Sequence, residues 1–196
     1  MNQLQYLLAQ FGDRKKRSLS ISMLLDVQDF PFGDWTIVGQ RVSRAGFFQG
    51  NNVLYRRTRE AGGYLAWRSW RLEEPRRGLW HQIIPYALVE DAERAVPLQV
   101  EMGSKNRAEV VVNESKILEG LSIPGTDTSW VCERFTTTQK GLGVSRYVVG
   151  NVGRFVFMLA ASARGEGWPM EEVASLASLQ ANRIRAVLED SGSVAG

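Results

Sequence analysis

Residues 130–190 read WVCERFTTTQKGLGVSRYVVGNVGRFVFMLAASARGEGWPMEEVASLASLQANRIRAVLED. β-branched and aromatic residues dominate the first half of this segment, and glycines interrupt them. The pattern predicts a meander of three strands, over residues 130–137, 144–149 and 152–161. Residues 141–143 and 150–151 are the predicted turns, because glycine and asparagine adopt the positive φ angles that tight hairpins need.

A long amphipathic helix is predicted after the meander. Trp168-Pro169 opens it, since proline fits the first helical position, where its missing N–H is not needed. The acidic pair Glu171 and Glu172 in the first turn suits the positive end of the helix dipole. One apolar stripe follows at helical spacing, formed by Val173, Leu176, Ala177, Ile184, Val187 and Leu188. We expect this stripe to pack across the sheet, with residues 190–196 as a flexible tail.

The preceding part of the chain predicts more strands and two shorter helices. Strands are expected over residues 35–42, 64–72 and 79–86, the last two joined by a turn over 73–78. Trp67 and Trp70 should lie on opposite faces of their strand, so both faces of the sheet should be covered. Helices are expected over residues 19–28 and from residue 89, the second ending or disturbed near Pro97.

Helices mixed with antiparallel strands indicate an α+β fold. The 196 residues suit one domain, and 44% hydrophobic residues suffice for a sizeable core. We therefore predict a single domain over residues 1–196, in which residues 1–18 form an N-terminal helix and basic segment.

Charge and cysteine content bear on the location. The net charge of +3 is too small to establish a nucleic-acid binder. No segment reaches the roughly 18 to 20 apolar residues that span a bilayer, and the start lacks the pattern of a secretory signal. Cys132 is the single cysteine, so no intrachain disulfide can form. We expect a cytoplasmic protein, or alternatively one held at the membrane surface through its N-terminal segment.

Catalytic and metal-binding motifs are missing from the sequence. His81 is the only histidine and Cys132 the only cysteine, which leaves too few ligands for a typical metal site and one base for a triad. Neither a Gly-x-Ser-x-Gly nucleophile elbow nor a phosphate-binding glycine loop occurs. We therefore predict no enzyme activity and no cofactor, and structural roles for both residues.

Arginines and aromatic residues interleave between Tyr55 and Trp80. The predicted binding residues within this segment are Arg56, Arg57, Arg68, Trp70, Arg71 and Trp80. A protein partner or a small ligand is the favoured occupant. The alternative is single-stranded nucleic acid, whose bases would stack on the aromatic rings while arginines contact phosphates. A purely structural interpretation has the aromatic rings in the core and the arginine stems over the sheet edge.

Several short motifs resemble known actinobacterial domains. Residues 24–35, with LLD followed by DFPFGDW, resemble a helix and the opening "D-L-P-x-G-W". VVGNV at 148–152 resembles a "V-G-N-x-V" strand, and Ala177, Gln180 and Arg183 resemble a closing "A-x-x-Q-x-x-R" helix. Ile123-Pro124-Gly125 falls where "V-P-G" often occurs. The similar families are the extracellular sensor domain of a mycobacterial serine/threonine kinase and the LpqN-type lipoproteins.

This resemblance implies an antiparallel sheet with helices packed on both faces, a fold of the Mog1/PsbP-like kind. It also implies a non-catalytic binding or scaffold module. No functional residues transfer, because the matched positions define the fold. Such domains are commonly exported or lipid-anchored, whereas this chain shows neither an export signal nor a lipobox cysteine. We expect a module that binds its partner or ligand through the sheet or in a groove beside the C-terminal helix.

Overall fold

One antiparallel sheet organises the computed structural model of the protein, which describes residues 14–30, 33–44, 57, 63–103, 111–138, 141–164 and 167–191. The strands are β1 (Thr36–Arg44), β2 (Tyr64–Leu72), β3 (Arg77–Pro85), β4 (Val111–Ile117), β5 (Thr128–Thr138), β6 (Gly141–Val152) and β7 (Phe155–Arg164). The helices are α3 (Val89–Gly103) and α4 (Met170–Asp190), preceded by the short η1 (Val27–Asp29) and by helical residues 14–22.

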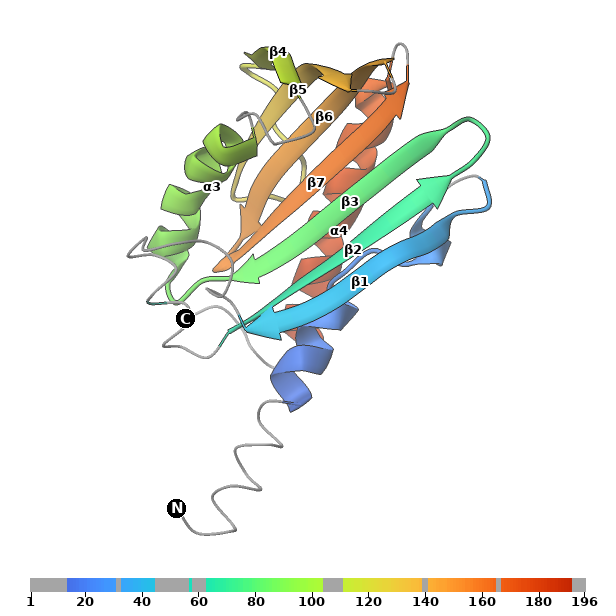
Figure 1. Ribbon diagram of the computed structural model, residues 1–196. Helices are drawn as coiled ribbons and strands as arrows, with labels where there is room; N and C mark the ends of the chain where they lie inside the picture. The colour runs from blue at the N-terminus through green and yellow to red at the C-terminus, as the bar shows by residue number, and fades with distance from the viewer. Residues whose placement is uncertain are drawn as a thin grey trace, which may run out of the picture.

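The strand order β1-β2-β3-β7-β6-β5-β4 consists of two meanders that meet where β3 pairs with β7. The first meander runs from β1 to β3. α3 then carries the chain to β4 at the far edge, and β4 to β7 return to the centre (Figure 1). Ile83 lies opposite Phe157 at the junction. This arrangement confirms the prediction of an α+β fold with an antiparallel sheet.

Side chains alternate between two cores on opposite faces of the sheet. In β7, Phe157 and Leu159 belong to the core beneath α4, whereas Val156 and Met158 belong to the core beneath α3. Figure 1 shows α3 in front of the sheet and α4 behind it. Helices therefore cover both faces, as predicted. We call these faces the α3 face and the α4 face.

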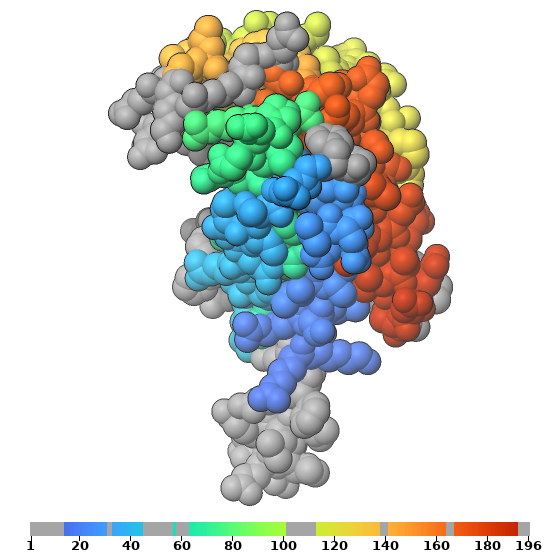
Figure 2. Space-filling model, turned by 90° about the vertical axis from the view of Figure 1, so that its right-hand side faces the viewer, coloured from blue at the N-terminus to red at the C-terminus, as the bar shows by residue number. Residues whose placement is uncertain are grey.

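Residues 14–30 complete the helical layer on the α4 face. Figure 2 shows this segment, in blue, between β1 and the red α4. Met23, Leu24 and Leu25 are fully buried there, and the hydroxyl of Ser20 donates to the Tyr64 carbonyl of β2 at 2.9 Å. The continuous helix predicted over residues 19–28 is wrong in its extent, because the helix ends at residue 22 and Asp26 then caps η1.

The turn predicted at Gly150-Asn151 is displaced, because β6 continues to Val152 and the chain reverses at Gly153, where φ is +52°. Asn151 is fully buried, and its side-chain oxygen accepts a hydrogen bond from the Thr128 amide at 3.0 Å. The asparagine thus serves the sheet rather than a turn. Gly141 and Gly143 likewise lie within β6, and not in a turn as predicted.

Pro97 lies inside α3 and does not end it. Pro97 and Glu93, whose carbonyl would have bonded to a residue at position 97, are both exposed. Water can therefore take the place of the missing N–H. The opposite side of the helix keeps its packing, since Ala92, Ala95 and Val96 are buried against the sheet.

Two further expectations concern Cys132 and membrane spans. Cys132 is buried in β5, 3.1 Å from the hydroxyl of Ser115, as expected for a structural cysteine. Among the described residues, none of the helices has the length and apolar character needed to cross a lipid bilayer.

Candidate functional site

A groove of about 340 Å³ lies between the first turns of α4 and the segment that leads from η1 into β1. Its lining residues are Asp29, Phe30, Trp35, Trp168, Glu171, Glu172, Ser175, Leu176 and Leu179. The groove runs beside the C-terminal helix, which is one of the two places where binding is predicted from the sequence.

Three aromatic rings form the floor of the groove. Phe30 stacks on Trp35 with ring centroids 4.8 Å apart, and Trp35 contacts Trp168 at 5.3 Å. The Trp168 indole N–H donates to the carbonyl of Ser162 at 3.2 Å, while the guanidinium of Arg77 lies 4.9 Å from the Trp168 ring centroid. Because these contacts fix the rings from several sides, the floor is rigid before any ligand arrives.

Carboxylates dominate the rim of the groove. Asp29 pairs with Arg183 at 2.6 Å, and Glu172 pairs with Arg77 at 2.7 Å. Glu171 is exposed and forms no ion pair within the described part of the chain. The rim therefore carries an excess of negative charge over an apolar floor, which disfavours an anionic ligand.

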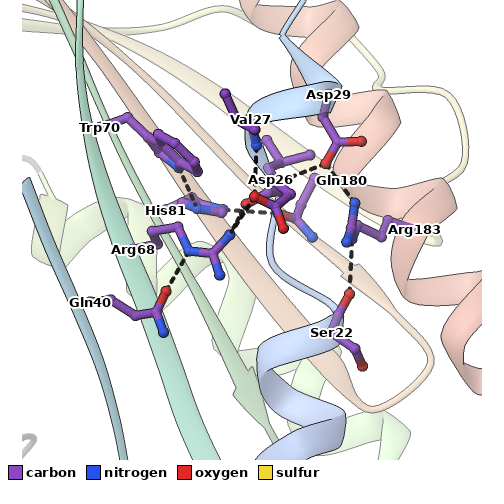
Figure 3. A network of polar contacts seen from close by, with 11 residues as sticks. Ser22, Asp26, Val27, Asp29, Gln40, Arg68, Trp70, His81, Gln180 and Arg183 are labelled. Carbon is purple, nitrogen blue, oxygen red and sulfur yellow. Dashed lines mark hydrogen bonds and ion pairs between the residues drawn. The ribbon is translucent and has the colours of Figure 1, made fainter. Parts of the chain in front are cut away.

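A chain of buried polar side chains connects the sheet to α4 near this groove (Figure 3). The Trp70 indole donates to Nε2 of His81 at 3.2 Å, which leaves Nδ1 as the protonated nitrogen that donates to the Gln180 amide oxygen at 3.1 Å. The Gln180 nitrogen in turn donates to the Met23 carbonyl. Burial lowers the pKa of His81 to about 4, so the imidazole is neutral at physiological pH.

Arg68 forms the second arm of this network. Its Nη1 donates to the Leu25 carbonyl at 2.6 Å and its Nε to the Gln40 side chain at 2.7 Å. A carboxylate oxygen of Asp26 lies 3.6 Å from Nη1. The side chain is only 7% exposed, so these contacts satisfy a cation that water hardly reaches. Both arms therefore fasten residues 23–26 to the α4 face.

Replacing Arg68 with alanine is expected to lower the free energy of unfolding by about 2 kcal/mol, because the buried Leu25 carbonyl loses its charged donor. The matched control is Arg71→Ala on the same strand. Its guanidinium is 52% exposed and lies 3.8 Å from Glu73, so the loss should stay below about 0.5 kcal/mol. Urea denaturation of both variants measures the difference, and equal losses would contradict the role given to Arg68.

The six binding residues predicted from sequence do not form one surface. Arg68 and Trp70 are buried on the α4 face, 6% and 2% exposed. Arg71 and Trp80 lie on the α3 face, since they alternate with those positions in the β2–β3 register. Arg57 pairs with Asp91 at 3.3 Å, and Arg56 lies outside the described residues. Binding by these residues, including binding of nucleic acid, stays a prediction.

The aromatic floor of the groove was not predicted as a site. Trp35 and Trp168 are 133 residues apart in sequence and were interpreted only as the start of a strand and of a helix. The sequence signal that could have indicated the site is that each tryptophan stands at the boundary of an element, within two residues of a glycine. Within the described ranges, no cluster of three or more histidine, cysteine or acidic residues could hold a metal ion.

Comparisons with protein-family models and with curated proteins find no match for this chain. Solved structures share its fold. The extracellular domain of PknH from Mycobacterium tuberculosis superposes with a TM-score of 0.55 at 8% sequence identity, covering 88% of this chain and 96% of that domain. An uncharacterized protein from Mycobacterium smegmatis superposes with a TM-score of 0.50 at 11% identity, covering 85% of this chain and 96% of its own.

These structures correct one prediction and support another. The prediction of a cytoplasmic location is wrong, because a structure that shares the fold is an extracellular domain. The alternative of attachment to a membrane surface through the N-terminal segment stays a prediction, since residues 1–13 lie outside the described residues. The likeness to LpqN-type lipoproteins and to the Mog1/PsbP-like fold stays a prediction. The resemblance to a mycobacterial extracellular sensor domain is confirmed for the fold alone, since the identities are low. This chain has the α+β fold that the extracellular domain of PknH also adopts.

Proposed function

We propose that this protein is a non-enzymatic binding module whose groove beside α4 takes a small apolar molecule that is neutral or positively charged. The observation that carries the proposal is the preformed floor of Phe30, Trp35 and Trp168, which line a groove of about 340 Å³. Cavities of about 300 to 1,000 Å³ with mainly apolar walls and few polar groups are typical of small-molecule sites.

The charges at the rim of the groove support a ligand that is neutral or positively charged. Asp29 and Glu172 are already neutralised by arginines, whereas Glu171 is available to attract a cation at the mouth of the groove. The PknH domain with the same fold is extracellular, and this supports a location outside the cytoplasm for the module as well. The fold of that domain also supports a binding role in preference to catalysis.

Three naphthalene probes that differ mainly in charge test the proposal. Naphthylmethylamine is expected to bind most tightly, naphthylmethanol less tightly and naphthylacetate least, because the rim repels a carboxylate. Quenching of tryptophan fluorescence reports the binding, since Trp35 and Trp168 line the groove. Absence of binding by all three, or tightest binding by naphthylacetate, would refute the proposed ligand class.

Replacing Leu179 with asparagine is expected to weaken naphthylmethanol binding about fivefold, because an apolar contact at the rim is lost. Leu98→Asn is the matched control. Both leucines lie on helices and are similarly exposed, at 41% for Leu179 and 39% for Leu98, but Leu98 is on α3 and far from the groove lining. Equal weakening in both variants would place the binding elsewhere.

A further inference from the structure

A second depression lies on the α3 face, over β2, β3, β7 and β6, and has a volume of about 250 Å³. α3 packs on β5, β6 and β7, and among the described residues Figure 1 shows no helix in front of β2 and β3. Small residues create the depression. In the register, Ala160 stands between Trp80 and Tyr147, and Ser162 stands between Gly78 and Ser145. Two large aromatic side chains thus flank a row of small ones.

The aromatic residues sit on β3 and β6, two strands apart, so their backbones are separated by roughly 10 Å. The guanidinium of Arg134 lies 4.7 Å from the Tyr147 ring centroid and holds that ring from the side of β5. Trp80 and Tyr147 are half-buried at their bases and packed against the core beneath α3. They therefore form two firm apolar walls with a narrow floor between them.

Several hydrogen-bonding groups line this depression without a partner among the described residues. The hydroxyls of Ser69, Ser145 and Tyr147 and the indole N–H of Trp80 form no hydrogen bond to any part of the chain that the structure describes. The Ser162 hydroxyl is engaged, through its bond to the Gly78 carbonyl at 3.3 Å. Each hydroxyl can both donate and accept, so the depression offers a mixed set of donors and acceptors.

We propose that this depression binds a neutral, polyhydroxylated ring such as a sugar or a cyclitol. None of its described lining residues is charged, so the lining itself offers no countercharge to an ionic ligand. A purely apolar ligand would desolvate the serine hydroxyls without giving them partners. A polyol ring satisfies both requirements, because its hydroxyls match those of the protein while its C–H faces pack on the aromatic rings. This site is separate from the groove beside α4 and does not depend on it.

Inositol and cyclohexanol form a matched pair of probes, since both are six-membered carbon rings and differ in the number of hydroxyls. Titration of the isotope-labelled full chain, followed by NMR, is expected to shift the Trp80 indole resonance with inositol or glucose, with dissociation constants on the order of millimolar. Cyclohexanol should bind at least tenfold less tightly.

Two variants place the binding in the depression. Ala160→Val should weaken binding at least tenfold by filling the floor, and valine is a good strand former. Tyr147→Phe should weaken binding about fivefold by removing one hydroxyl while keeping the ring. The groove variant Leu179→Asn should bind inositol as the wild type does, which separates the two sites. The proposal is overturned if no neutral polyol shifts the Trp80 resonance at concentrations on the order of 100 mM, if cyclohexanol binds equally well, or if both variants bind normally.

Discussion

Replacing Trp168 with alanine is expected to lower the free energy of unfolding by about 4 kcal/mol, the largest effect of any single change considered for this chain. The indole is 2% exposed and joins the loop before α4 to the rest of the α4 face. Its loss leaves a cavity beside Trp35 and removes the hydrogen bond to Ser162. The ring of Trp168 also packs against the guanidinium of Arg77, so the Arg77–Glu172 pair loses this support.

Trp130→Ala is the control for this change. Trp130 lies in β5 with 40% of its surface exposed, so its truncation should cost only about 1 kcal/mol. Guanidinium denaturation with tryptophan fluorescence and circular dichroism measures both variants. A loss for Trp168→Ala no larger than that for Trp130→Ala would show that the aromatic floor does not hold α4 to the sheet.

The second large effect is on the pH dependence of stability. His81 has a pKa of about 4 in the folded protein, against about 6.5 when unfolded, because burial penalises the charged form. The unfolded chain therefore takes up a proton first as the pH falls. The contribution of His81 to the free energy of unfolding is fully present above pH 6.5 and decreases as the pH falls from 6.5 to 4. Below pH 4 this contribution no longer changes with pH. The pKa difference of about 2.5 corresponds to about 3 kcal/mol.

The hydrogen-bond geometry around His81 also disfavours the protonated imidazole. A protonated imidazole would carry hydrogen on both nitrogens, and its Nε2–H would then face the N–H of Trp70. Protonation must break that contact. The hydrogen bond to the Gln180 oxygen raises the pKa of His81, but it does not offset the effect of burial, and the cations Arg68 and Arg183 lower the pKa further.

Denaturation at a series of pH values tests this expectation. Between pH 6.5 and 5, above the range of ordinary carboxyl groups, the wild type should lose about 2 kcal/mol. His81 is the only histidine, so His81→Gln should remove most of this slope, whatever its effect on stability at neutral pH. A variant that keeps the wild-type slope would contradict the assignment.

The sequence predicted those elements whose formation depends on residues close together in the chain. The β2–β3 hairpin and α4 follow from alternation, from the turn residues around Pro75 and from the stripe that includes Leu176 and Ile184. Fold class follows from the same elements. The order of strands does not, because the pairing of β3 with β7 joins residues such as Ile83 and Phe157, which no local pattern relates.

The polar network was beyond prediction for a similar reason. Gln180 lies on the buried side of α4 between Ala177 and Ala181, where a polar residue contradicts the apolar pattern. Its partners His81 and Met23 come from distant parts of the chain. The groove also depends on tertiary structure, since Phe30, Trp35 and Trp168 meet only after the sheet has formed. The motif that resembles a closing "A-x-x-Q-x-x-R" helix includes Gln180 and Arg183, but it predicted no contacts for them.

The attachment of residues 22–25 has an implication for sequence divergence. Arg68, Gln180 and Arg183 all donate to main-chain carbonyls, those of Leu25, Met23 and Ser22. A carbonyl is present whatever the side chain, so mutations in this segment leave the acceptors in place. Substitutions at position 22 and apolar exchanges at 23 and 25 are therefore expected to leave this attachment in place, whereas the loss of any one of the three donors removes one of its hydrogen bonds.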